Sequence, residues 1–297
     1  MILSASASQV LATALGRALD EPVVPLRYRR FPDGELLVEV DPTADLPAGV
    51  AVEGDRLTID GRAVVVASTA SAEAHIEALL LQDVAVAAGA DPVVTVVPYL
   101  GYARQEVAHE PGQPASARAV ARALSTTTDR VVTVDPHEPL VADYFDAPCE
   151  VVSAVPALAD ALTIAGDRPL VIAPDEGAFE HAVALRDAIG TGDVDHFEKH
   201  RRGPETVELT PSETDVEGRE VVLVDDIVAT GSTIAQATAL LLAAGAATVR
   251  VACVHALLVG GAYSRLHRAG VDELVATDTI EGPVARASAA EAIADVL

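Results

Sequence analysis

Short apolar runs alternate along this chain with alanine- and leucine-rich stretches of helical length, and this alternation constrains the fold more than any other feature. The runs are continuous in apolar residues, as expected for strands covered on both faces in a parallel sheet. They occupy residues 63–67, 93–97, 131–134, 170–173, 221–224 and 249–254. Stretches with the length and composition of helices occupy residues 74–89, 115–125, 178–189 and 232–245. This β-α-β-α order predicts a doubly wound α/β fold with right-handed crossovers.

The length of the chain, 297 residues, suggests two domains at roughly 100–200 residues each. Residues 138–156 contain three prolines and little periodicity, so we expect the domain boundary there. We place the domains at 1–140 and 141–297. Residues 50–63 contain two turn signals, EGD and DG, and predict a hairpin or an insertion.

The charge balance narrows the possible partners. Asp and Glu number 45 against 20 Lys and Arg, a net charge of −25, which argues against a protein that binds nucleic acid by neutralising phosphates. Only one of the basic residues, Lys199, is a lysine. A lysine-poor, acidic composition predicts adaptation to strong salt, where the Debye length falls to about 3 Å and screens the self-repulsion of an acidic surface. The alternative is an ordinary acidic bacterial protein.

Cysteines and terminal patterns predict a cytoplasmic protein. Cys149 and Cys253 form no CxxC pair and lie in apolar sequence, so we expect both to be buried in a reducing compartment. The first 16 residues lack the basic region of a signal peptide, and no apolar run reaches the roughly 18 residues of a membrane span. Because Glu198 and not glycine precedes Lys199, there is no P-loop.

Polar, turn-rich segments follow four of the predicted strands. They are PYLGYARQE after 93–97, DPHEP after 131–134, APDEG after 170–173 and DDIVATGST after 221–224. Ligands of open α/β sheets bind just beyond the carboxyl ends of the strands. Two of these segments lie in each half of the chain, which indicates an enzyme with sites built from both halves.

The segment VVLVDDIVATGSTIAQA, residues 221–237, is the most specific motif. An apolar strand ends in Asp225 and Asp226, and a loop of small residues then leads into a helix. The loop consists of Ala229, Thr230, Gly231, Ser232 and Thr233. Backbone N–H groups, hydroxyls and a helix N-terminus form an anion cradle that needs no lysine, and two carboxylates accept hydrogen bonds from a vicinal diol. The motif predicts a ribose 5-phosphate site; the simpler alternative is a strand–turn–helix with an aspartate cap.

Seven further segments appear in the order of a known family across nearly the whole chain. They are RRFPDGELLVEV (29–40), VVPYLGYARQE (96–106), PGQPASARAVA (111–121), VVTVDPHEP (131–139), APDEG (173–177), EKHRRGPE (198–205) and ATDTIEGPVARASAAEAIA (276–294). With this order, the chain resembles the ribose-phosphate pyrophosphokinase family, and its PGQPASA stretch resembles archaeal members. The resemblance implies two tandem type I phosphoribosyltransferase-like domains, each with a mainly parallel sheet flanked by helices.

The family's reaction implies the substrates and the cofactor. It transfers the β,γ-diphosphoryl group of ATP to the anomeric hydroxyl of ribose 5-phosphate, yields phosphoribosyl pyrophosphate (PRPP) and AMP, and uses Mg²⁺. Because charge accumulates on the transferred group, catalysis should come from positioning and cations rather than from a covalent intermediate. The resemblance further implies a homo-oligomer with the ATP motifs in the first domain and the ribose 5-phosphate loop in the second.

Two pairs of residues match the catalytic and metal-binding positions of the family. Lys199 and Arg201 match a KxR pair on a hairpin that closes over ATP; two residues apart in extended backbone, they face the same side. A solvated basic loop is the alternative. His137 matches a histidine near Mg²⁺ and the ATP phosphates, and Asp175 matches a Mg²⁺-binding aspartate. Mg²⁺ prefers carboxylate oxygens and substrate phosphates, so Asp175 fits better as a ligand than His137.

Five more residues match the ATP-binding positions of the family. They are Phe31, Asp33, Glu35, Arg104 and Gln105. The resemblance implies that Phe31 stacks on adenine, often from a neighbouring subunit, while Asp33 and Glu35 help to orient it. For the nearby Tyr99 and Tyr102 we expect half-buried packing.

Some positions depart from the family pattern. The usual DTGGT loop is ATGST here, so Ala229 removes a carboxylate near the ribose and Ser232 requires an unstrained φ. Two other functions stay open. A phosphoribosyltransferase that consumes PRPP shares the 221–233 loop but needs one such domain, and a non-catalytic regulatory homologue would be expected to lose the cations or metal-binding residues.

Overall fold

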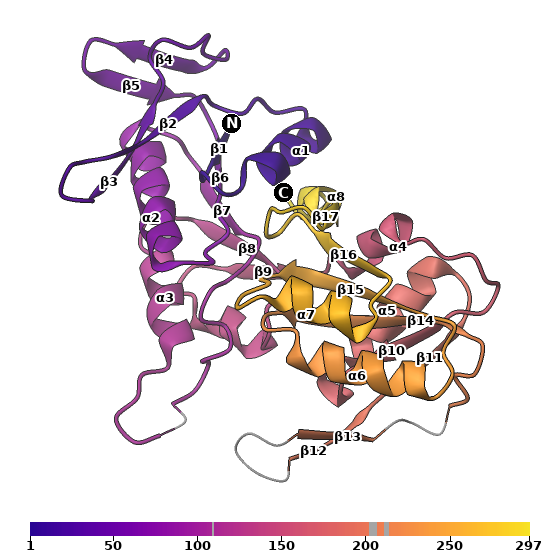
Figure 1. Ribbon diagram of the computed structural model, residues 1–297. Coiled ribbons are helices and arrows are strands. Elements are labelled where there is room, and N and C mark those ends of the chain that lie inside the picture. Colours follow the sequence, from indigo (N-terminus) through magenta and orange to yellow (C-terminus); the bar gives the residue numbers. More distant parts are fainter. Residues whose placement is uncertain (109, 202–206, 211–213) are drawn as a thin grey trace. The chain divides into compact units, whose positions relative to one another are not determined.

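The computed structural model describes residues 1–108, 110–201, 207–210 and 214–297 (Figure 1). Contacts divide the chain into two compact units. Unit 1 comprises residues 1–153, 278–281 and 288–297, and unit 2 comprises residues 154–277 and 282–287. The chain thus changes units after residues 153, 277, 281 and 287. The first change lies within the predicted boundary region, and not at 140, because the strand Cys149–Val152 still pairs in the first sheet.

Unit 1 is built on a five-stranded parallel sheet in the order β1-β6-β7-β8-β9. Its strands are β1 (Ile2–Ser4), β6 (Ala63–Val66), β7 (Val93–Val97), β8 (Arg130–Val134) and β9 (Cys149–Val152). Helices α2 (Ala72–Ala87) and α3 (Ser116–Leu124) lie on one side, and α1 (Gln9–Leu19) and α8 (Ala290–Ala294) on the other (Figure 1). Alternate strand residues therefore face different helices, and β6 and β7 are buried throughout.

Two antiparallel hairpins extend unit 1 beyond its sheet. One pairs β2 (Leu26–Arg30) with β3 (Leu36–Val40), and the other pairs β4 (Val50–Glu53) with β5 (Arg56–Ile59). The second is the hairpin predicted within residues 50–63. A 3₁₀ helix, η1 (Pro139–Tyr144), connects β8 to β9.

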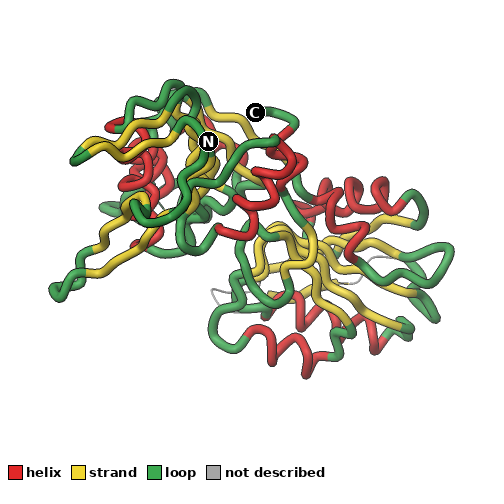
Figure 2. Tube along the Cα trace, turned by 90° about the horizontal axis from the view of Figure 1, so that it is seen from above, coloured by secondary structure: helices red, strands yellow, loops and turns green. Residues whose placement is uncertain are grey.

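Unit 2 contains a six-stranded parallel sheet in the order β11-β10-β14-β15-β16-β17. Its strands are β10 (Leu170–Ala173), β11 (Asp193–His196), β14 (Glu220–Val228), β15 (Thr248–Ala256), β16 (Glu273–Thr277) and β17 (Ala285–Ala287). Helices α6 (Ser232–Ala243) and α7 (Ala262–Ala269) cover one face, and α4 (Leu158–Ala161) and α5 (Phe179–Ile189) the other (Figure 2). Two 3₁₀ turns, η2 (Val155–Ala157) and η3 (Glu176–Ala178), precede α4 and α5.

The strand order of unit 2 reverses between β10 and β14. From β10 the chain runs through α5 to β11 on one side, whereas β14 leads through α6 to β15 on the other. Ligands of open α/β sheets bind at such a reversal, outside the carboxyl ends of the strands. In unit 1 the sheet order follows the chain order without reversal.

A two-stranded hairpin lies between β11 and β14. It pairs β12 (Glu198–Arg201) with β13 (Val207–Thr210), and Lys199 is opposite Leu209. A hairpin therefore stands where the family resemblance implies one.

The predicted parallel α/β architecture is confirmed, and the predicted strands and helices are found within a few residues of their bounds. The main correction concerns residues 221–224, because β14 continues to Val228. Ile227 and Val228 are buried and pair with His255 and Ala256 of β15, so the two acids interrupt the apolar run without ending the strand.

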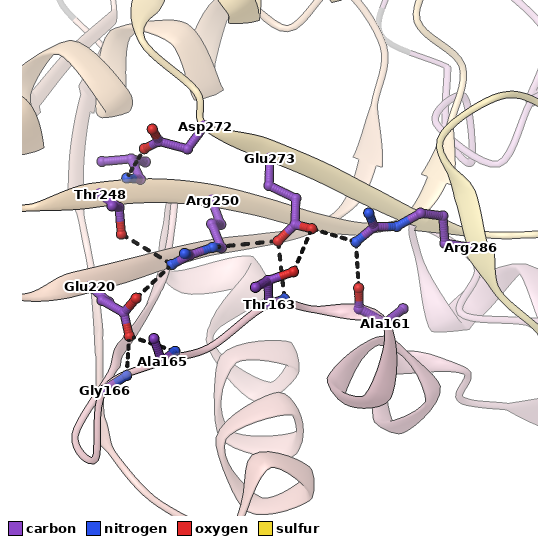
Figure 3. A network of polar contacts seen from close by, with 11 residues as sticks. Ala161, Thr163, Ala165, Gly166, Glu220, Thr248, Arg250, Asp272, Glu273 and Arg286 are labelled. Carbon is purple, nitrogen blue, oxygen red and sulfur yellow. Dashed lines mark hydrogen bonds and ion pairs between the residues drawn. The ribbon is translucent and has the colours of Figure 1, made fainter.

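A network of ion pairs joins four strands of unit 2 (Figure 3). Arg250 of β15 lies between Glu220 of β14 (3.1 Å) and Glu273 of β16 (3.4 Å), and Arg286 of β17 binds Glu273 at 2.5 Å. The same carboxylates accept hydrogen bonds from backbone N–H groups of residues 163, 165 and 166. The network thus ties the segment after α4 to the sheet.

The cysteines differ in burial. Cys253 is fully buried as predicted, whereas Cys149 at the edge strand β9 is half-buried. Burial and the neighbouring Glu150 carboxylate raise the pKa of Cys149 to about 12, so this thiol stays protonated at neutral pH. Among the described residues no helix has both the length and the apolar character needed to cross a membrane.

Candidate active site

Three carboxylates gather at the reversal between β10 and β14. Asp225 and Asp226 are among the last four residues of β14, and Asp175 follows β10 at the start of η3. Asp226 is only 8% exposed. The Asp225 carboxylate accepts a hydrogen bond from the Asp226 N–H (3.0 Å), and the Asp226 carboxylate accepts one from the Ile227 N–H (2.8 Å). These local bonds fix both acids at the carboxyl end of the strand.

The environment of Asp225 disfavours its charge. Burial raises the pKa of Asp225 well above its usual range, and the neighbouring charges of Asp226 and Asp175 raise it further. Three like charges close together repel one another, and a bound cation or hydrogen-bond donors would reduce this repulsion. Strongly perturbed acids in a crevice are typical of functional sites.

The Ala229–Thr233 loop connects β14 to α6 beside these acids. Gly231 caps the helix with a left-handed φ of +71°, which favours glycine. The first amide groups of a helix have no acceptor inside it. In the part of the chain that the structure describes, the N–H groups of residues 230–233 donate to no other group, and the hydroxyls of Thr230 and Ser232 lie 3.3 Å apart. The loop therefore presents donors suited to an anion.

In unit 1, three sequence-predicted residues follow neighbouring strands. Arg104 and Gln105 come after β7 and His137 after β8, and all three are exposed. The turn before Arg104 is fixed by Thr69, whose N–H donates to the Tyr99 carbonyl (2.9 Å) and whose hydroxyl accepts from the Gly101 N–H (2.9 Å). Because parallel strands end at one edge, the segments bearing these residues start from the same edge of the sheet.

Phe31, Asp33 and Glu35 lie at the tip of the β2–β3 hairpin, and not on the sheet. Phe31 is 45% exposed. Its N–H donates to the Glu35 carbonyl (2.9 Å), and the Asp33 carboxylate accepts from the Glu35 N–H (3.2 Å). The tip is therefore an ordered turn with an aromatic side chain on its surface.

Lys199 and Arg201 are both in β12, two residues apart along the strand. Their side chains lie outside the described part of the structure, so only their backbone positions are assigned. Of the two tyrosines predicted to be half-buried, Tyr99 is buried, which corrects that prediction, and Tyr102 is 45% exposed.

Sequence reasoning missed Arg265 of α7, which donates a hydrogen bond to the Thr230 carbonyl. The two residues are 35 positions apart, and no motif connects them. Only the packing of α7 against the start of α6 reveals the contact.

Comparison with known proteins agrees with this arrangement. Residues 1–127 match the N-terminal domain of ribose phosphate pyrophosphokinase, and residues 157–286 match the phosphoribosyl transferase domain. The chain is 51% identical to the ribose-phosphate pyrophosphokinase of Halobacterium salinarum over all 297 residues, which cover 100% of both chains. It is 40% identical to that of Methanopyrus kandleri, covering 100% of this chain and 98% of the relative.

A solved structure extends the likeness to the whole fold. The crystal structure of phosphoribosylpyrophosphate synthetase from Mycobacterium smegmatis matches with a TM-score of 0.80 and 28% identity, covering 100% of this chain and 96% of that one. The identity of 51% over the full length, with both domains matched in order, is enough to assign the family of this chain. The chain belongs to the ribose-phosphate pyrophosphokinase family.

Proposed function

We propose that the chain transfers the β,γ-diphosphoryl group of ATP to the anomeric hydroxyl of ribose 5-phosphate, giving PRPP and AMP. The observation that carries the proposal is the position of the Asp225–Asp226 pair directly before a loop with unused N–H donors. Ribose 5-phosphate bears complementary groups, namely adjacent hydroxyls that donate and a phosphate that accepts. Family membership supports the same reaction.

The Ala229–Thr233 loop would bind the 5-phosphate. Its amide groups stand at the N-terminus of α6, where the helix dipole favours negative charge. Ala229 and Ser232 replace family residues at two positions of the loop, and neither substitution removes a backbone donor. Backbone recognition thus accounts for phosphate binding in a loop with no basic side chain.

Asp225 and Asp226 would accept hydrogen bonds from the ribose hydroxyls. Since burial and like charges raise the pKa of Asp225, donors placed beside it stabilise its ionised form. Binding of the sugar therefore relieves part of the repulsion among the acids. This coupling favours a polyhydroxylated ligand over a simple phosphate.

The acids also fit Mg²⁺. The donor set at the β10–β14 reversal is made of carboxylate oxygens, which Mg²⁺ prefers. Among the described residues no group of three or more His, Cys, Asp or Glu side chains is arranged to enclose a metal. Mg²⁺ commonly takes one or two carboxylates and completes its shell with water and phosphates, so we propose contacts from Asp175 and from His137. The ion would neutralise charge on the diphosphoryl group.

The remaining residues would hold the nucleotide and the transferred group. We propose that Phe31 stacks on adenine, that Asp33 and Glu35 orient it, and that Arg104 and Gln105 contact ATP. Lys199 and Arg201 would grip the diphosphate during transfer. In the reaction the anomeric oxygen bonds to the β-phosphorus, the bond from that phosphorus to the α,β-bridging oxygen breaks, AMP leaves with that oxygen, and the proton of the anomeric hydroxyl is released. Positioned cations lower the barrier to such a transfer.

The first test is to incubate the protein with ATP, Mg²⁺ and ribose 5-phosphate and to follow AMP. Production of AMP and PRPP in equal amounts is expected. If no AMP forms, and if the protein consumes PRPP in a separate incubation with a nucleobase, it is a phosphoribosyltransferase. Binding of ribose 5-phosphate without either reaction would indicate a non-catalytic homologue.

The second test assigns the diol site. Asp225→Asn or Asp226→Asn should weaken ribose 5-phosphate binding about ten-fold or more, the size of a lost charged hydrogen bond, and leave ATP binding within about two-fold. Titration calorimetry measures both, and Asp187→Asn, an exposed acid of α5 in the same unit, is the matched control. Loss of ATP affinity with ribose 5-phosphate affinity intact would mean that the loop is assigned to the wrong substrate.

We also propose that the protein is a homo-oligomer. The exposed Phe31 at the hairpin tip suits an adenine contact made to a neighbouring subunit. Light scattering during gel filtration in strong salt, together with an activity assay of the same sample, tests this. A fully active monomer would overturn the contact between subunits.

A further inference from the structure

The carbonyl side of the Ala229–Thr233 loop is held by one segment of the chain. Three consecutive carbonyls, of residues 228, 229 and 230, accept hydrogen bonds from that segment. The donors are the N–H of Leu258 (3.1 Å), the N–H of Val259 (3.0 Å) and the guanidinium of Arg265. The first two bonds continue the pairing of β14 with β15. The third is different, because a charged side chain from α7 reaches the loop itself.

The face of α7 that carries Arg265 also packs on Gly231. A Cβ added at Gly231 would lie 3.2 Å from Cγ of Leu266 and 3.5 Å from Cβ of Ala262. Residues 262, 265 and 266 share one face of the helix, since they are spaced by three and four positions. This face of α7 therefore supports both residues of the Thr230–Gly231 peptide from behind.

The peptide between Thr230 and Gly231 connects Arg265 to the proposed phosphate site. Its carbonyl accepts from the guanidinium, and its N–H, on Gly231, is among the donors unused in the described part of the chain. The two ends of a trans peptide point in opposite directions. A cation on the carbonyl therefore turns the N–H away from α7 and increases its positive polarisation, because hydrogen bonds in a chain strengthen one another.

We propose that Arg265 is a positioning residue for the phosphate of the sugar substrate, acting through the Thr230–Gly231 peptide. This inference rests on the proposed function, because it assigns the loop to a sugar phosphate. Arg265 touches the loop and not the substrate in this role. It lets a positive charge strengthen phosphate binding, while the small residues of the loop still allow the backbone to approach the phosphate closely.

The role predicts a selective loss of ribose 5-phosphate binding. Arg265→Leu should raise the KM for ribose 5-phosphate roughly ten-fold, the scale of one charge-assisted hydrogen bond, and change kcat and the KM for ATP by less than about three-fold. Arg265→Lys should restore most of the affinity, and Arg265→Gln, a neutral donor, should restore part of it. Arg268→Leu, the loss of an exposed arginine on the same helix, is the control for net charge and for α7.

Calorimetric binding of ribose 5-phosphate and thermal unfolding of each variant complete the experiment. The proposal is overturned if Arg265→Leu binds ribose 5-phosphate within two-fold of the parent, or if Arg268→Leu loses as much. It is also overturned if Arg265→Gln is as poor as the leucine variant while lysine restores binding fully, because the charge then acts on the substrate directly. Failure of the parent to bind ribose 5-phosphate at all would instead refute the proposed function.

Discussion

His75 lies on α2 with its ring 5.5 Å from that of Tyr102, and in the described chain neither of its ring nitrogens has a hydrogen-bond partner. Burial lowers the pKa of His75. As the pH falls below about 6.5, the unfolded chain gains a proton that the folded chain resists, so the folded state loses stability.

His75→Leu should therefore stabilise the protein by about 1 kcal/mol near neutral pH, because it removes a buried group without partners. The gain should grow between pH 6.5 and 5.5. Unfolding temperatures of both proteins from pH 5 to 8 measure this. An equal gain at every pH would show that His75 does not titrate on unfolding, and a loss would show that the ring has a structural role.

Lys199 is the only lysine in the chain, and Lys199→Ala should leave the fold intact, since an alanine in a hairpin strand costs little. Turnover should fall about 10²–10³-fold, as for the loss of one positioned donor in a transition state, and both KM values should move far less. Arg201→Ala should act similarly, and the double variant should lose less than the product of the two. Steady-state kinetics of these variants are compared with those of Arg186→Ala, which removes a half-buried cation of α5. A near-parental rate would leave the hairpin without a catalytic role.

At the residue scale, residue types and their spacing predicted that Asp225, Asp226 and the Ala229–Thr233 loop form one site, because these residues lie close together in sequence. They could not predict that β14 runs through both acids to Val228, since that depends on pairing with β15. The role of Arg265 could not be predicted from the sequence either, because its contact with Thr230 forms only when α7 packs against the loop.

At the scale of elements, the ion-pair network of unit 2 depends on one residue, Arg250, whose replacement should lower the stability of the protein. Arg250 is 11% exposed and neutralises Glu220 and Glu273. Burial would raise the pKa of Glu273, but hydrogen bonds from Arg286 and Thr163 outweigh it and lower the pKa below its usual value. Stability from this acid is therefore present above about pH 4.5 and is lost as the pH falls further.

Arg250→Met should cost about 2–4 kcal/mol, because it leaves the half-buried Glu220 without its cation and Glu273 with Arg286 alone. Arg168→Met is the matched control, since that arginine, 76% exposed, makes a surface ion pair worth about 0–1 kcal/mol. Urea unfolding at pH 7 compares them. Equal losses would mean that the network adds nothing beyond a surface pair.

The central strands of the two sheets were predictable because burial on both faces makes their sequences continuously apolar. Edge strands were not. Residues of β11 and β17 are mostly half-buried and polar or small, and their pairing is decided by neighbours distant in sequence. The antiparallel hairpin at residues 50–59 was predictable since its turn carries a local signal.

For the molecule as a whole, a net charge of −25 makes ionic strength a determinant of stability. Raising KCl from 0.1 to 1 M shortens the Debye length from about 10 to about 3 Å and weakens repulsion between the acids. The unfolding temperature should rise by several degrees over this range. Sucrose at matched osmolality is the control for solute exclusion. A flat dependence on KCl would mean that the acidic surface imposes no net repulsion.

The return of residues 278–281 and 288–297 to unit 1 has a consequence for the order in which the chain matures on the ribosome. Glu281 accepts from the N–H of Val10 (2.5 Å) at the start of α1, and the Asp278 carboxylate accepts from the N–H of Ala289 (2.8 Å). Unit 1 therefore cannot be completed when its first 153 residues have emerged, although they contain its entire sheet. We expect the half that is translated first to be the half that finishes folding last, with α1 lacking its partner α8 throughout synthesis of unit 2.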